Sequence, residues 1–152
     1  MRLATALLLW LLAACSPAPA TLGDASRLPQ AKLPAITLSI GSVSLLAEVA
    51  DTDGERRAGL ARREELAAGD GMLFVYRQDT PLYFTMRDTL IPLSIAFIDA
   101  DGRIFSIQSM QPGSQTLYSP GTPGRYALEV PQGWFRDNGI RVGDRVRNLP
   151  AP

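Results

Sequence analysis

Carboxylates and arginines are the main side chains in this sequence that could take part in chemistry. The 152 residues include no histidine and one cysteine, Cys15. A Ser-His-Asp triad, an imidazole acid or base and a histidine-bearing zinc site are therefore excluded. Any reaction would have to use carboxylates, hydroxyls, tyrosines, arginines or the only lysine, Lys32.

A polar tripeptide between two apolar runs, Arg87-Asp88-Thr89, is the first candidate binding site. Loops held by a rigid sheet often carry binding groups. Asp88 and Thr89 could then bond a polar ligand, assisted by Arg57 or Arg87. The alternative, which we favour, is a plain turn in which Asp88 bonds its own backbone.

Arg57 and Glu129 are a second candidate pair, because both stand next to apolar positions. They could form one buried ion pair that fixes structure, which is the interpretation we favour. Alternatively, Arg57 could hold a carboxylate or a phosphate in a bidentate contact. Paired carboxylates could support glycoside hydrolysis, but no spacing selects a pair.

No metal and no cofactor are expected. Asp99-Ala100-Asp101-Gly102 begins like a calcium loop, yet the further ligands that such a loop needs are missing. A hairpin turn of the Asp-Gly type is predicted there instead. The 15 basic residues balance the 15 acidic ones, so we do not expect nucleic acid as a partner.

The N-terminus has the features of a signal peptide. Arg2 precedes an apolar run, residues 3–14, which is shorter than the roughly 20 residues of a membrane-spanning helix. The run ends in Leu12-Ala13-Ala14-Cys15, which resembles a bacterial lipobox. The resemblance implies cleavage before Cys15 and its lipidation. Because Ser16 is not aspartate, it also implies the periplasmic face of the outer membrane.

Three segments are predicted from composition. Residues 1–14 form the signal peptide, and residues 15–35 form the lipidated cysteine and a flexible tether, which contains four prolines. Residues 36–149 form a single β-rich domain.

The domain is predicted to be mainly β. Alternating or short apolar stretches indicate strands at residues 36–40, 43–49, 72–76, 82–86, 94–99, 103–108 and 125–130 and near Val146. Thr52 and Glu55 fit a capping box, so a short helix should begin there and end at a left-handed Gly59. A second helical turn is expected at Trp134. Seven or eight short strands with about two helical turns predict a compact antiparallel sandwich or barrel.

Five motifs occur in order along the domain: 55–60 (ERRAGL), 71–75 (GMLFV), 84–99 (FTMRDTLIPLSIAFID), 125–130 (RYALEV) and 139–146 (GIRVGDRV). They resemble the domain-of-unknown-function family 192 over nearly the whole domain. The resemblance implies a mainly β fold and frequent export or lipid anchoring. It implies no established activity.

The sequence departs from the family pattern at a few positions. The family usually has Trp, Asn and Asp where this chain has Thr85, Asp88 and Ser94, and Met is common where Ala61 stands. A family site that uses that Trp or that Asp would be altered here. The positions that fit the pattern are Arg57, Gly59, Met86, Thr89, Pro92 and Glu129.

The expected function is non-catalytic binding of a small polar ligand, an envelope glycan or a partner protein near the membrane, to which Cys15 attaches the chain. The candidate ligand-binding residues are Arg57, Arg87, Asp88, Thr89 and Glu129. One alternative is a hydrolase that acts on an envelope glycan, with Asp88 or Glu129 as acid or base, and burial that raises a carboxyl pKa would favour it. Another alternative is a purely structural envelope protein.

Overall fold

The computed structural model describes residues 28–151. The predicted signal peptide, Cys15 and most of the predicted tether lie outside these residues. Between residues 28 and 151, no helix is both long enough and apolar enough to cross a bilayer.

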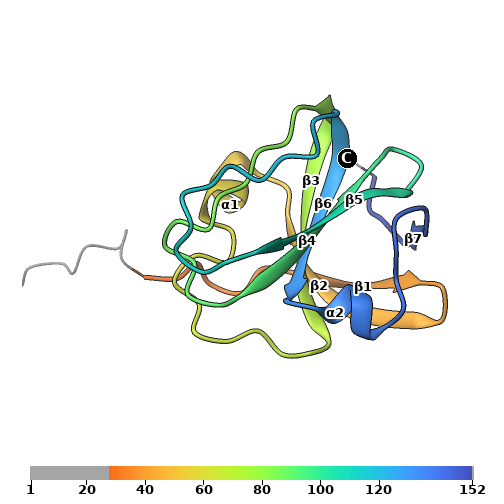
Figure 1. Ribbon diagram of the computed structural model, residues 1–152. Coiled ribbons are helices and arrows are strands. Elements are labelled where there is room, and N and C mark those ends of the chain that lie inside the picture. The colour runs from red at the N-terminus through yellow and green to blue at the C-terminus, as the bar shows by residue number, and fades with distance from the viewer. Residues whose placement is uncertain (1–27, 152) are drawn as a thin grey trace, which may run out of the picture.

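One seven-stranded sheet, with strand order β5-β4-β6-β3-β2-β1-β7, forms the body of the molecule. It curls into a half-barrel, so that β1 and β2 run across the direction of β3 and β6 (Figure 1). The predicted mainly β fold is confirmed, as one continuous curled sheet. The strands are β1 (Ala35–Ile40), β2 (Val43–Ala50), β3 (Asp70–Thr80), β4 (Leu93–Ile98), β5 (Ile104–Met110), β6 (Gly124–Pro131) and β7 (Val146–Arg147).

The strand pairs are antiparallel except β2 and β3, which are parallel. Parallel neighbours need a crossover, because a tight hairpin can only reverse the chain. Here the crossover contains helix α1 (Asp53–Ala58) and an irregular stretch, residues 59–69. This crossover places α1 over the sheet, beside the site described below.

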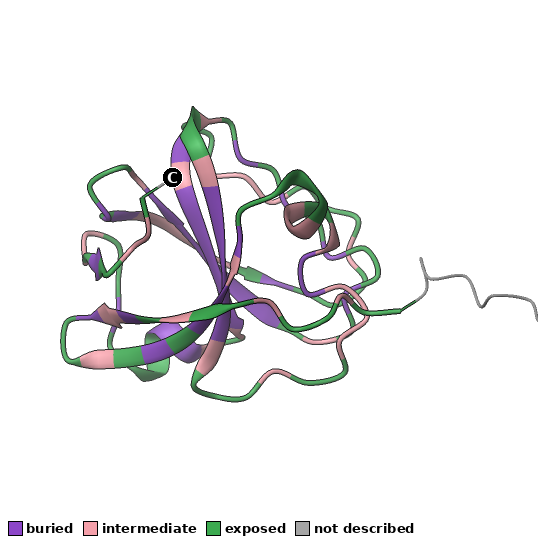
Figure 2. Cartoon of the chain, turned by 180° about the vertical axis from the view of Figure 1, so that it is seen from behind, coloured by how far each residue is buried: buried purple, intermediate pink, exposed green. Residues whose placement is uncertain are grey.

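Apolar side chains cover both faces of the curled sheet. One cluster includes Trp134 and Phe135 of the second helix, α2 (Trp134–Asp137), and packs against β1, β2 and β7. The other cluster includes Phe74 of β3, Phe97 of β4, and Phe84 of the loop between these two strands. Because both faces are covered, β4 is buried along its whole length (Figure 2).

The predicted start and end of α1 are confirmed. The Thr52 hydroxyl accepts a hydrogen bond from the backbone N–H of Glu55, and the Glu55 carboxylate accepts one from the backbone N–H of Thr52. Gly59 follows the helix with φ of 48°, in the left-handed region. The capping box therefore fixes where α1 begins.

The predicted strand at residues 82–86 is wrong. Leu82, Phe84 and Met86 are buried and alternate with exposed neighbours, which is the pattern that suggested a strand. However, this segment joins no strand of the sheet, and its one ladder contact is a bridge between Phe84 and Tyr118. Alternation of buried and exposed residues shows only that one side of an extended segment is buried. Here the buried side packs against the sheet without joining it.

Candidate ligand-binding site

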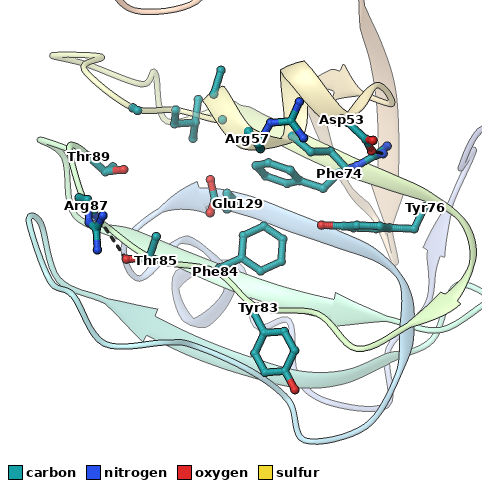
Figure 3. A pocket seen from close by; sticks show the side chains of 15 residues that line it. Asp53, Arg57, Phe74, Tyr76, Tyr83, Phe84, Thr85, Arg87, Thr89 and Glu129 are labelled. Atoms are coloured by element: carbon teal, nitrogen blue, oxygen red, sulfur yellow. Dashed lines mark hydrogen bonds and ion pairs between the residues drawn. The ribbon is translucent and has the colours of Figure 1, made fainter. Parts of the chain in front are cut away.

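A pocket of about 390 Å³ opens between α1, the loop that follows β3, and strands β3 and β6. Figure 3 shows its charged and aromatic side chains converging from these separate segments. The lining residues are Asp53, Arg56, Arg57, Ala58, Gly59, Leu60, Ala61, Phe74, Tyr76, Tyr83, Phe84, Thr85, Arg87, Thr89 and Glu129.

Arg56 attaches α1 to the sheet. Its guanidinium donates a 2.7 Å hydrogen bond to the carbonyl oxygen of Val75 and lies 4.9 Å from the centre of the Tyr76 ring. It also forms an ion pair with Asp53, one helical turn away. These contacts hold α1, which forms one wall of the pocket, against the sheet. The positive charge of Arg56 is already paired with Asp53.

Aromatic rings form the apolar wall of the pocket. The rings of Phe74 and Phe84 pack edge to face, with their centroids 4.9 Å apart. The ring of Phe84 also packs edge to face on that of Phe97, which belongs to β4, with the ring centroids 5.8 Å apart. Tyr83 stands at the rim with 64% of its surface exposed. The packing of Phe84 on Phe74 and Phe97 holds the loop that follows β3 against β3 and β4.

Glu129 lies in the middle of the pocket, on β6, with 5% of its surface exposed. Burial raises the pKa of its carboxyl group to about 8. Among residues 28–151, no cation forms an ion pair with this carboxyl group, and burial is the only cause of its raised pKa, with no hydrogen bond to it. At neutral pH the side chain is therefore mostly a neutral carboxylic acid, which can donate one hydrogen bond and accept others.

Arg57 and Arg87 bring positive charge to opposite sides of Glu129. Arg57 is exposed on α1, and Arg87 is exposed on the facing loop, where its backbone N–H donates to the Thr85 hydroxyl at 3.3 Å. No carboxylate of the described chain lies within ion-pair distance of either guanidinium. Such a site can attract an anion.

The structure brings four of the five predicted ligand-binding residues together. Arg57, Arg87, Thr89 and Glu129 all line the pocket. The buried pair of Arg57 with Glu129 that we favoured is not present, because the two side chains line one cavity without an ion pair.

Asp88, the fifth predicted residue, does not line the pocket. Its φ is 60°, in the left-handed region that aspartate tolerates better than most residues. Its carbonyl oxygen accepts a 2.7 Å hydrogen bond from the backbone N–H of Arg62, and its carboxylate lies 3.5 Å from the Arg62 guanidinium. Asp88 therefore connects this loop to the stretch that follows α1.

The positions that depart from the family pattern fall in different places. Thr85 and Ala61 line the pocket, and both are smaller than the residues common in the family. Ser94 lies elsewhere, and its hydroxyl accepts a 3.0 Å hydrogen bond from the backbone N–H of Gly133, before α2. Sequence reasoning missed the contributions of Tyr76 and Thr85, because only the fold brings them to the pocket.

Several solved structures are similar to this chain, among them the following two. One is a proposed transcription regulator from Sinorhizobium meliloti 1021, with a TM-score of 0.75 and 27% identity over 78% of this chain and 96% of that chain. The other is a protein of unknown function from Novosphingobium aromaticivorans DSM 12444, with a TM-score of 0.73 and 28% identity over 88% of this chain and 94% of that chain.

No curated protein matches the chain. A family model does match, over residues 36–148, and it is the model of DUF192, described as an uncharacterized ACR. The matched range contains most of β1, all of the six strands from β2 to β7, and both helices. The chain therefore belongs to the DUF192 family.

Proposed function

We propose that this protein is an exported, lipid-anchored envelope protein that binds a small polar ligand or glycan fragment in the pocket around Glu129. The observation that carries the proposal is a buried carboxyl group that faces the pocket with no partner from the described chain. Among residues 28–151, every fully buried side-chain oxygen or nitrogen has a hydrogen-bond partner, so the unpartnered oxygens of Glu129 open onto the pocket, where a ligand could bond to them.

The pocket has the usual composition of a small-molecule site. Aromatic side chains form much of its wall, and a few polar groups could orient the ligand. The lipobox supports the envelope location, because Cys15 is the only cysteine and stands at the acceptor position. The balanced charge of the chain gives no support for nucleic-acid binding, which the description of the Sinorhizobium neighbour would suggest.

A thermal-shift screen of the full-length protein in detergent tests the binding proposal. The panel would contain envelope sugars, peptidoglycan fragments, amino acids and nucleotides. A ligand that binds only the folded state, present at about 100 times its Kd, adds roughly 2.7 kcal/mol of stability.

Two variants locate any hit. Arg57→Ala should abolish the shift, because Arg57 lines the pocket. Asp88→Ala should retain it, because Asp88 lies on the same loop as Arg87 but outside the pocket. A hit lost in Asp88→Ala and kept in Arg57→Ala, or no hit at all, would count against the proposal, and the latter would favour a structural role or a protein partner.

A hydrolase that acts on an envelope glycan is the second candidate. The raised pKa of Glu129 favours it, because a carboxyl group that is protonated at neutral pH can act as a general acid. Asp53 also lines the pocket, although it is paired with Arg56. Product formation from labelled glycan fragments, lost in Glu129→Gln, would support this activity, and binding without turnover would exclude it for those fragments.

A further inference from the structure

We propose that the ligand of this pocket is a sugar-sized molecule with a single anionic group, which Arg57 and Arg87 hold while the Glu129 carboxyl group donates a hydrogen bond to it. The inference rests on the proposed function and specifies the chemical class of its ligand. Its three supports are the charge of the pocket, the orientation of Glu129 and the aromatic wall.

The charged groups of the pocket leave an excess of positive charge. Three arginines and two acidic residues line it. Asp53 is paired with Arg56, and the buried Glu129 is mostly neutral at neutral pH. The guanidinium groups of Arg57 and Arg87 then remain for a ligand. A carboxylate or a phosphate has the charge and the acceptor oxygens that guanidinium groups bind, and hydrogen bonds between ions are stronger than those between neutral groups.

Glu129 gives this site its dependence on protonation. A neutral carboxyl group can donate to an anion, whereas an ionised one would repel it. No carboxylate other than Asp53 lines the pocket, and the strand neighbours of Glu129, Met72 on β3 and Ile95 on β4, are apolar. The titratable and charged groups that share the pocket with Glu129 are Asp53, Arg56 and Arg57 from α1, Tyr76 from β3, and Tyr83 and Arg87 from the loop.

The aromatic wall indicates that the ligand has a body beyond its anionic group. Phe74 and Phe84 pack edge to face and are buried behind the pocket wall, whereas Tyr83, with 64% of its surface exposed, offers its ring at the rim. The volume of about 390 Å³ is at the lower end for small-molecule sites. A sugar ring has polar edges and an apolar face that can lie on an aromatic ring. It suits this combination of surfaces better than a bare inorganic ion does.

Titration calorimetry on the full-length protein in detergent provides the test. The probes are D-glucuronate, D-glucose 6-phosphate and D-glucose at pH 6.5, which share a ring and differ in charge. We expect at least one anionic sugar to bind tenfold or more tightly than glucose. The comparison of glucuronate with the phosphate ester then identifies the anionic group as a carboxylate or a phosphate.

Charge-removing variants assign the anion to its site. Arg57→Gln and Arg87→Gln should each weaken binding of the anionic sugar about tenfold, as expected for loss of a hydrogen bond between charged groups. Arg141→Gln is the matched control, because Arg141 is exposed and lies outside the pocket, and it should leave the Kd unchanged.

The pH dependence tests the role of Glu129. Affinity of the wild-type protein for the anionic sugar should fall as pH rises from 6.5 to 9, because Glu129 loses its proton in that range. Glu129→Gln keeps a neutral side chain that can donate a hydrogen bond. This variant should bind the anionic sugar at pH 6.5, and its affinity should fall much less than that of the wild type between pH 6.5 and 9.

The failures of the two proposals are distinguishable. If glucose binds as tightly as both anionic sugars, and the arginine variants change nothing, the anion inference is overturned while binding in the pocket still stands. The same holds if the thermal-shift screen gives a neutral or cationic ligand that needs the pocket. If no probe and no panel compound binds, both proposals are wrong.

Discussion

Glu129 is the residue on which the interpretation of the site depends. It occupies a position in β6 where the alternation of the strand directs it toward α1, and the neighbouring strands cover it with Met72 and Ile95. No residue of the described chain neutralises it. The protein thus retains an ionisable group in a buried position where an apolar side chain of similar size would pack at no electrostatic cost.

Glu129 should make the protein less stable as pH rises. Its pKa is about 8 in the folded state against an ordinary 4.5, so the folded protein keeps a proton that the unfolded chain releases. The stabilisation by this retained proton is fully present below pH 4.5 and is lost as pH rises through about 8, with a total loss of about 5 kcal/mol.

Thermal unfolding of the wild type and Glu129→Gln at pH 5, 7 and 9 measures this contribution. The Tm of the variant relative to the wild type should increase at each step, since glutamine does not titrate. The lowered pKa of Glu48 affects both proteins equally and cancels in the difference. Two curves that remain parallel from pH 5 to 9 would mean that Glu129 is not protonated in the folded state.

The elements that were predictable from sequence are those with local causes. The capping box at Thr52 and Glu55 and the turn at Gly102 depend on residues within a few positions of each other. The parallel pairing of β2 with β3 has no local signal. The long crossover between the two strands does not by itself determine which strand β3 will pair with. Without that pairing, α1 could not be placed over β6.

The candidate site was predictable only in part for the same reason. Arg57, Arg87, Thr89 and Glu129 could be selected by residue type and neighbourhood. Their convergence depends on contacts between segments that are far apart in the sequence, such as α1 (Asp53–Ala58) and β6 (Gly124–Pro131). Asp88 was selected by the same reasoning, and its polar side chain instead joins the loop to Arg62.

Gly59 should be required for the end of α1. Its φ of 48° is unfavourable for a β-branched residue, and an added Cβ would stand 3.5 Å from the Phe74 ring. Gly59→Val should therefore lower the free energy of unfolding by about 1–3 kcal/mol, measured by urea denaturation. Gly54→Ala, in the same helix but without a positive φ, should be neutral or slightly stabilising. Equal urea midpoints for Gly59→Val and the wild type would show that the helix end tolerates a side chain.

At the scale of the whole molecule, the chain enters its folded part beside the pocket. The Gln30 side chain donates a 2.7 Å hydrogen bond to the carbonyl oxygen of Gly59, and the backbone N–H of Leu33 donates one of 2.8 Å to Glu48. Glu48 is also held by Arg63. Gln30 and Leu33, both in the predicted tether, thus attach this segment to the end of α1 and to β2 respectively.

The proposed lipid anchor depends on one residue. Cys15→Ser removes the thiol that would be lipidated, so the protein should move from the membrane pellet to the soluble fraction, followed by immunoblotting after fractionation. Ser16→Asp is the matched control, since it keeps the thiol and should leave the protein in the membrane pellet. If the Cys15→Ser protein also remained in the pellet, the proposed lipidation would be refuted.

The pairing of β1 with β7 has a consequence for how the protein is made. Ser39 and Ile40 near the start of the folded part pair with Arg147 and Val146 at its end. A chain synthesised from its N-terminus therefore carries an open edge on β1 until Val146 and Arg147 have been made. Open strand edges are where separate chains join and aggregate. The short final strand thus covers the end of β1 at Ser39 and Ile40 only after the rest of the sheet has been made.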